Sequence, residues 1–177
     1  MKEENIIGSR RSSNYLWACI TLIGGVTFIL SGLSSYIQVN LLPVTDSTQL
    51  VFFPQGITMI FYGTMSGLLS MYLWLVIIWD IGGGYNRFDL DRGVITVFRR
   101  GFPGENRKIN LTYPIQEIKS IKVCIKEGLN PKREIYLCTK DQRTIPLTHV
   151  SQPEKLADIE SHATNLAQFL GVLLEGL

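Results

Sequence analysis

The sequence predicts a two-helix transmembrane hairpin followed by a soluble α+β domain, built from an antiparallel sheet and a C-terminal helix. Two stretches, residues 12–45 and 50–79, contain no Asp, Glu, Lys, Arg or His and are long enough to cross a bilayer as helices. After residue 87 the pattern changes to short alternating segments separated by turns. The chain ends in an amphipathic helical pattern.

Residues 1–14 are expected to form a polar lead-in. They include Lys2, Arg10 and Arg11 as well as two glutamates. The apolar segment that follows is too long for the core of a cleavable signal peptide, and the glutamates are untypical of a transit peptide. We therefore expect an uncleaved N-terminus.

The hairpin is predicted to occupy residues 15–79, with spans at about 15–37 and 57–79. At about 1.5 Å per residue, roughly 20 helical residues cross a hydrocarbon core of about 30 Å. Glycines and serines recur at seven-residue spacing in both spans, a period that lets helices approach closely; they are Gly25, Gly32, Gly56, Gly63 and Ser70. Packing of the two helices on each other is the favoured explanation, and a dimer or partner groove is the alternative.

Basic residues flank the hairpin on one side only. Arg10 and Arg11 precede the first span and Arg87 and Arg92 follow the second, whereas the connecting loop carries Asp46 and no Lys or Arg. By the positive-inside rule, both termini and the soluble domain are expected on the cytoplasmic side or its organellar equivalent.

Residues 80–86 (DIGGGYN) are predicted to be a glycine-rich linker, since the run lacks the Gly-Lys-Ser/Thr of a phosphate loop. Residues 87–177 then form the soluble domain. Its segments RFDL and VITVFRR flank an Asp-Arg-Gly turn and predict a β-hairpin, which RKINLTY extends. Further strands are expected at residues 120–126, 134–139 and 144–148.

The last element is predicted to be a helix with a capping box at Ser151 and Glu154. Its apolar stripe consists of Leu156, Ile159, Ala163, Leu166, Ala167 and Leu170. A bent antiparallel sheet closed by one C-terminal helix resembles a pleckstrin-homology-like module, and a plain two-layer α+β sandwich gives the same pattern.

The charge distribution favours a mixed surface over a nucleic-acid site. The formal net charge is +2, and residues 87–143 hold thirteen Lys and Arg against seven Asp and Glu. This basic body is either an ordinary solvated surface or a face turned toward anionic headgroups or an acidic partner. No nucleic-acid partner is expected.

Residues with catalytic or metal-binding potential are few. The two histidines, His149 and His162, stand alone, and no sequence motif for zinc, a nucleophile or a dinucleotide occurs. The three cysteines have no metal-binding spacing and are interpreted as packing residues. The sequence therefore predicts no catalytic residue, cofactor or metal. A membrane-anchored enzyme is the least favoured class, because its chemistry would need a cofactor for which the sequence contains no motif.

An ordered set of motifs resembles the photosystem I assembly protein family of thylakoid membranes. The motifs are FFPQG (52–56), FYG (61–63), GYNRFD (84–89), FRRGFPGENR (98–107) and IPLT (145–148). The resemblance implies a non-catalytic scaffold in the thylakoid membrane of a plastid or cyanobacterium. It also implies that the partners are newly made photosystem I subunits and the lipid bilayer, with a homo-oligomer or larger assembly complex as a further expectation.

Four residues are predicted to bind a partner because of their charge and their position in the sequence. Arg99 and Arg100 end a predicted strand beside the GFPGEN turn, and Asp158 and Glu160 lie on or beside the polar side of the last helix. Each is equally well explained as a solvated surface charge, because an exposed ion pair contributes at most about 1 kcal/mol. The alternative function is a membrane-anchored module that senses lipid or a partner.

Overall fold

The computed structural model describes residues 1–43, 45–105, 107–126, 132–148 and 156–176. These residues form two compact units. The hairpin unit is Ser9–Asp80, and the sheet-containing unit joins Met1–Gly8 to Ile81–Leu177. The hairpin is therefore an insertion between the first strand of the sheet-containing unit and the rest of it.

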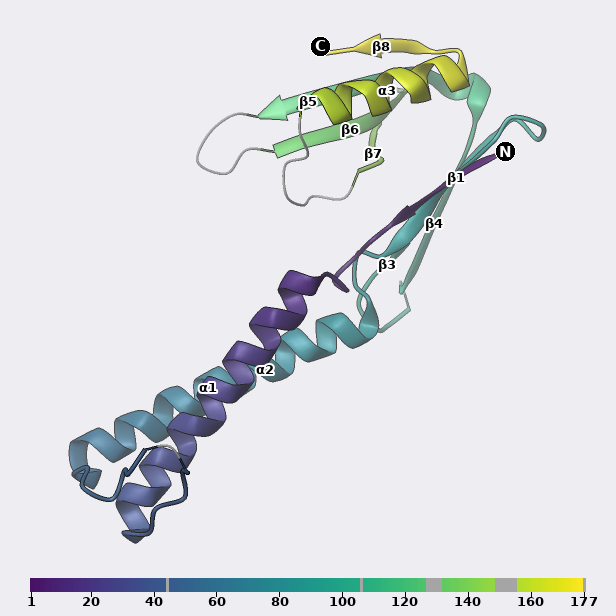
Figure 1. The fold of residues 1–177 in the computed structure, drawn as a ribbon. Helices are drawn as coiled ribbons and strands as arrows, with labels where there is room; N and C mark the ends of the chain where they lie inside the picture. The colour runs from purple at the N-terminus through teal and green to yellow at the C-terminus, as the bar shows by residue number, and fades with distance from the viewer. Residues whose placement is uncertain (44, 106, 127–131, 149–155, 177) are drawn as a thin grey trace. The chain divides into compact units, whose positions relative to one another are not determined.

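Two long apolar helices make up the hairpin unit, as the sequence predicts. They are α1 (Ser12–Ile37) and α2 (Ile57–Trp79), and a short π-helical turn, η1 (Phe52–Gly56), leads into α2. Both are long and apolar enough to cross a membrane. The helix α1 begins three residues before the predicted span. Figure 1 shows α1 and α2 side by side along their length.

Glycines set the closest approach of α1 and α2. A Cβ atom on Gly63 would lie 2.8 Å from the carbonyl oxygen of Gly25, and one on Gly32 would lie 2.6 Å from that of Gly56. Neither distance leaves room for a methyl group without a shift of backbone. Gly24 and Gly67 instead face open space. The seven-residue stripe thus packs the hairpin on itself.

Serine side chains satisfy polar groups inside the hairpin unit. Ser70 donates to the carbonyl oxygen of Ala18 at 3.0 Å, and Ser66 donates to that of Thr21 at 2.8 Å. At the loop end of α1, Ser35 donates to the Leu50 carbonyl and the Ser34 hydroxyl accepts from the Leu41 amide. Hydrocarbon offers no substitute partners, so these bonds suit a membrane environment.

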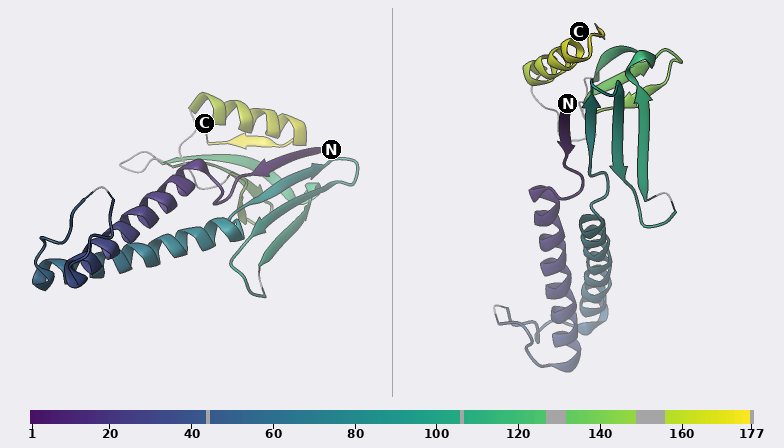
Figure 2. Two further views of the ribbon diagram at one scale, coloured as in Figure 1. Left: turned by 60° about the horizontal axis from the view of Figure 1, so that its bottom comes forward. Right: turned by 90° about the vertical axis from the view of Figure 1, so that its right-hand side faces the viewer.

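The first sheet has the strand order β1-β2-β3-β4, with every neighbouring pair antiparallel. Its strands are β1 (Lys2–Ile6), β2 (Gly84–Asp89), β3 (Val94–Arg100) and β4 (Lys108–Pro114). The β2–β3 hairpin and the added β4 match the sequence prediction. The right-hand view in Figure 2 shows β4 at the outer edge of this sheet.

Two domain boundaries differ from those predicted. Residues 2–6, expected in a polar lead-in, form the edge strand β1, and the predicted linker at 80–86 overlaps β2, which begins at Gly84. The strand β1 is polar because its charges pair across the sheet and beyond it: Glu3 with Arg87 at 2.9 Å, and Glu4 with His162 at 3.0 Å. Hydrophobic periodicity cannot reveal such a strand.

The second sheet has the order β7-β6-β5-β8. It comprises β5 (Ile118–Lys126), β6 (Lys132–Thr139), β7 (Thr144–Pro146) and β8 (Leu173–Glu175), and a short 3-10 turn, η2 (Ile115–Glu117), precedes β5. The predicted antiparallel pairing holds for β5, β6 and β7, whereas β8, a strand that was not predicted, pairs parallel with β5. Helix α3 (Leu156–Leu170) carries the chain back so that β8 runs in the direction of β5.

One core joins both sheets to α3. Phe88, Ile95 and Val97 of the first sheet belong to the same buried cluster as Ile121 and Leu137 of the second. From α3 the cluster includes Ile159, Ala163, Leu166, Ala167 and Leu170, which are five of the six residues of the predicted stripe. The side chain of the sixth, Leu156, falls outside the described part of the chain. Figure 1 shows α3 lying along β5 and β6. The predicted capping box at Ser151 and Glu154 falls outside the described residues.

Candidate interaction surfaces of the sheet-containing unit

Arg99 is half-buried and bonds inward. Its guanidinium donates to Asn86 Oδ1 at 2.8 Å and to the Leu147 carbonyl oxygen at 3.1 Å. The Leu147 oxygen also accepts from Asn86 Nδ2 at 2.8 Å, so the three residues tie the first sheet to the segment after β7. Burial lowers the pKa of Arg99. The period-two pattern of β3 already places Arg99 on the face of Ile95 and Val97.

Arg100 lies on the opposite face of β3, where its side chain is exposed. It pairs in register with Lys108, so two basic side chains occupy adjacent strands. Its backbone is fixed by the glycine segment that follows α2: the Arg100 amide donates to Gly83 O, and its carbonyl accepts from the Gly82 amide, both at 2.8 Å. Of the two predicted arginines, Arg100 is the one whose side chain is exposed.

Asp158 and Glu160 lie on α3, away from the bonds of Arg99. Asp158 is exposed in the first helical turn, where a negative charge is favourable to the helix dipole. Glu160 is half-buried. The hydrogen bonds of Arg99 go to β2, β3 and the end of β7, not to either acid, so the structure does not unite the arginine and acid candidates in one site.

The outer face of the first sheet carries an aromatic and cationic cluster that the sequence patterns do not predict. Tyr85 and Phe98 stack with ring centroids 5.1 Å apart, and the Arg87 guanidinium lies 5.1 Å from the centroid of Tyr85. The Glu3 carboxylate holds Arg87 by a hydrogen bond and raises the pKa of that guanidinium. Only the β2–β3 register, which pairs Tyr85 with Phe98, could have revealed this cluster.

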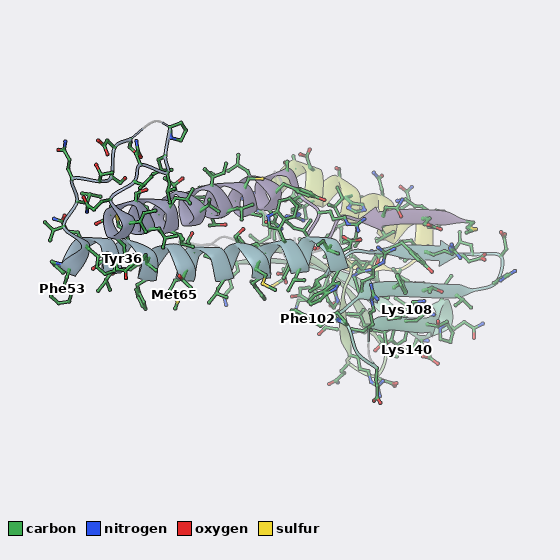
Figure 3. The ribbon with its side chains drawn as sticks, turned by 90° about the horizontal axis from the view of Figure 1, so that it is seen from below. Tyr36, Phe53, Met65, Phe102, Lys108 and Lys140 are labelled. Atoms are coloured by element: carbon green, nitrogen blue, oxygen red, sulfur yellow. The ribbon has the colours of Figure 1, made fainter. Side chains whose placement is uncertain are left out.

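Exposed apolar side chains mark the β4 side of the first sheet. Ile109 is 44% exposed and Leu111 is 38% exposed, and Phe102 in the preceding loop is 56% exposed. Figure 3 labels Phe102 and Lys108 on this unit, and Tyr36, Phe53 and Met65 along the hairpin. The sequence pattern predicts this strand but does not indicate that its apolar side chains are exposed.

Titratable groups elsewhere in the unit form contacts typical of structural residues. Burial opposes the charge of Glu4, but the hydrogen bonds from His162 and Lys2 outweigh it and lower the pKa of that carboxyl. Tyr136 donates to Glu134, which raises the pKa of the phenol to about 12. Across the described part of the chain, no group of three or more His, Cys, Asp and Glu side chains could hold a metal ion.

Comparison with known proteins gives one consistent family. A family model described as Ycf4 matches residues 1–168. The chain is 61% identical to the photosystem I assembly protein Ycf4 of Pyropia yezoensis, over 99% of this chain and 95% of that protein. It is 59% identical to the protein of the same name from Trichodesmium erythraeum, over 98% of this chain and 93% of that one. These matches confirm the resemblance seen in the motifs.

Proposed function

Because the chain belongs to the Ycf4 family, we propose that it is an assembly factor for photosystem I that acts as a non-catalytic scaffold in the thylakoid membrane. The observation that carries the proposal is the near full-length similarity to proteins named for photosystem I assembly, in cyanobacteria and in algae. Newly made photosystem I subunits and the surrounding lipid are the partners that this role requires.

The form of the hairpin unit supports a scaffold embedded in lipid. Its interior is filled by glycine and serine contacts, and large apolar side chains such as Ile23 (66% exposed) and Met71 (61% exposed) face outward. Those side chains suit contact with acyl chains or with the apolar helices of another membrane protein. The arginines before α1 and after α2 favour an orientation with both termini on the stromal or cytoplasmic side.

We propose Arg100, Asp158 and Glu160 as partner-contact residues of the sheet-containing unit. The exposure of Arg100 and Asp158 supports direct contact. The inward bonds of Arg99 favour an indirect role, in which it positions the end of β3 and the Arg100 side chain beside it.

A pleckstrin-homology-like arrangement is our proposal for the sheet-containing unit. A four-stranded antiparallel meander, a second sheet begun by three antiparallel strands and a following C-terminal helix support it. In this arrangement the membrane hairpin occupies the connection between the first two strands.

Affinity capture of the full-length protein from thylakoids tests the proposed function. Photosystem I subunits are pulse-labelled during synthesis, the membranes are dissolved in mild detergent, and bound proteins are identified by mass spectrometry. We expect newly labelled core subunits with little mature complex. Arg100→Glu should reduce the captured label several-fold, while Arg143→Glu, the same change elsewhere on the unit, should not.

Two results would contradict the proposal. Recovery of an unrelated enzyme complex would exclude the assembly role. Recovery of lipid alone, with binding that rises with the anionic lipid content of added vesicles, would favour the lipid-sensing alternative.

A further inference from the structure

The strand β4 is one of the two edge strands of the first sheet, and β1 is the other. Neighbouring strands occupy both sides of β2 and β3, but β4 pairs only with β3 among the described residues. An unpaired edge presents a row of backbone donors and acceptors that can bind another extended chain. The outer edge of the first sheet in Figure 2 is this strand.

The hydrogen-bond pattern shows which backbone groups of β4 face outward. The Gly101 amide donates to Arg107 O, and the Ile115 amide donates to Gly93 O, both at 2.8 Å. Bonding toward β3 alternates along an antiparallel strand, so residues 107, 109, 111, 113 and 115 bond inward. The amides of Lys108, Asn110 and Thr112 therefore point to the open edge, and Pro114 ends the row because it has no amide hydrogen.

The side of β4 that shares its face of the sheet with the buried core carries apolar side chains that remain partly exposed. Leu111 is the cross-strand neighbour of Val97 and shares its face of the sheet. Val97 is 2% exposed, whereas Leu111 is 38% exposed and Ile109 is 44% exposed. An added strand beside β4 would set its own inward side chains next to Ile109 and Leu111 and cover them.

Charge at the start of β4 indicates the chemistry of the added strand. Arg107 and Lys108 are exposed, and their side chains form no ion pair with any other residue that the structure describes. Pairing of two copies of β4 would leave these cations unmatched and add a second set. An acidic partner segment would match them instead.

We propose that the β4 edge binds an extended segment of another protein by strand addition, with alternating apolar side chains over Ile109 and Leu111 and an acidic residue beside Arg107 and Lys108. The inference deepens the proposed function and rests on it for the source of the segment, which is a newly made photosystem I subunit. Backbone pairing provides affinity, and the apolar and acidic side chains provide selectivity.

Asn110→Pro in the full-length protein tests the backbone pairing. It removes an outward amide and leaves the inward bonds to β3 in place, since proline is tolerated where the amide faces the open edge of a strand. Asn110→Ala keeps the amide and is the matched control. We expect about five- to tenfold less captured subunit with Asn110→Pro, the loss expected for one backbone hydrogen bond together with a steric conflict. With Asn110→Ala the change should be less than twofold.

Lys108→Glu provides a second test that does not depend on tolerance of proline. Charge reversal at this exposed side chain should lower capture several-fold at low salt and less at high salt. Lys122→Glu, the same change at an exposed position of β5, should leave capture unchanged. A photoreactive benzoylphenylalanine in place of Thr112 then identifies the bound segment by mass spectrometry.

The outcomes separate this inference from the proposed function. Cross-links to a photosystem I segment with alternating apolar residues and an acid, lost in Asn110→Pro, support it. Undiminished capture by both Asn110→Pro and Lys108→Glu overturns it while the assembly role stands, and cross-links to a second copy of the chain overturn it in favour of self-association. Failure of the wild-type protein to capture any photosystem I subunit overturns both proposals.

Discussion

At the scale of single residues, adjacent arginines on one strand have opposite roles. Alternation along β3 turns Arg99 toward the core and Arg100 toward solvent. A buried guanidinium is stable only when its donors are bonded, and Asn86 Oδ1 with the Leu147 carbonyl meets that need. Arg99 thus links β3 to β2 and to the segment after β7, whereas the side chain of Arg100 is exposed.

Arg99→Met should destabilise the sheet-containing unit by about 1–2 kcal/mol. Hydrogen bonds to charged groups contribute about 1.5–3 kcal/mol, and partial exposure of Arg99 reduces that contribution. Thermal unfolding of the full-length protein in mild detergent measures the loss. Arg107→Met, an exposed position, should change stability by less than about 0.5 kcal/mol. Equal unfolding temperatures for the two variants would show that the Arg99 bonds are not stabilising.

The carboxyl of Glu4 should make stability depend on pH. Its pKa is lowered in the folded state, against a burial effect that raises it, by His162 and Lys2. The charged form stabilises the fold above the unfolded pKa near 4.5, and this contribution disappears as pH falls through the lower folded value. Unfolding measured from pH 6 to pH 3 should show less acid destabilisation in Glu4→Gln than in wild type. Glu105→Gln, in an exposed loop, should retain the wild-type profile.

At the scale of elements, small residues decide how the two membrane helices pack. The second helix contains a Gly63-x-x-x-Gly67 motif, and its two glycines have different surroundings. Gly63 lies against the backbone of α1, and Gly67 faces open space. The first is required for close packing, and the second is available for contact outside the hairpin.

Gly63→Ala should destabilise the hairpin by about 1–3 kcal/mol, the usual cost of overpacking. The added methyl would lie 2.8 Å from both the Gly25 carbonyl oxygen and the Ile29 amide nitrogen, so the helices must separate. Unfolding in dodecyl sulfate, followed by tryptophan fluorescence, measures the change. Gly67→Ala is the matched control and should unfold like wild type. If the two variants unfold alike, the helices do not meet at Gly63.

Local patterns account for what the sequence could predict about these elements. Hydropathy located α1 and α2, period-two alternation located β5, and the apolar stripe located α3. The missing strand β1 carries Lys2, Glu3 and Glu4, and it becomes a strand only through pairing with residues some eighty positions away. The Tyr85 and Phe98 stack was missed because Tyr85 lies within the predicted linker at 80–86, so that its pairing with Phe98 was not expected.

At the scale of the whole molecule, the membrane hairpin interrupts a single folded unit. The chain enters α1 from β1 and returns from α2 into β2, and β1 and β2 are hydrogen-bonded neighbours. Gly8 and Gly83 lie close together where these two connections begin: a Cβ on Gly8 would lie 2.1 Å from the Gly83 nitrogen. The sheet-containing unit is therefore tethered to the hairpin twice, by segments that the sheet holds side by side.

Replacing residues 2–6 with a glycine and serine segment of the same length should destabilise the sheet-containing unit and spare the hairpin. The change removes five cross-strand pairs and the contacts of Glu3 and Glu4, which together are worth about 2–4 kcal/mol. Faster proteolysis within residues 81–177, with unchanged helical circular dichroism from the hairpin, is the expected result. Addition of a synthetic KEENI peptide at high concentration should restore part of the protection, because the edge of β2 is then filled again. If the variant and the wild type are cleaved at the same rate, the sheet is stable with β2 as its edge strand. Residues 2–6 would then contribute only a connection into α1.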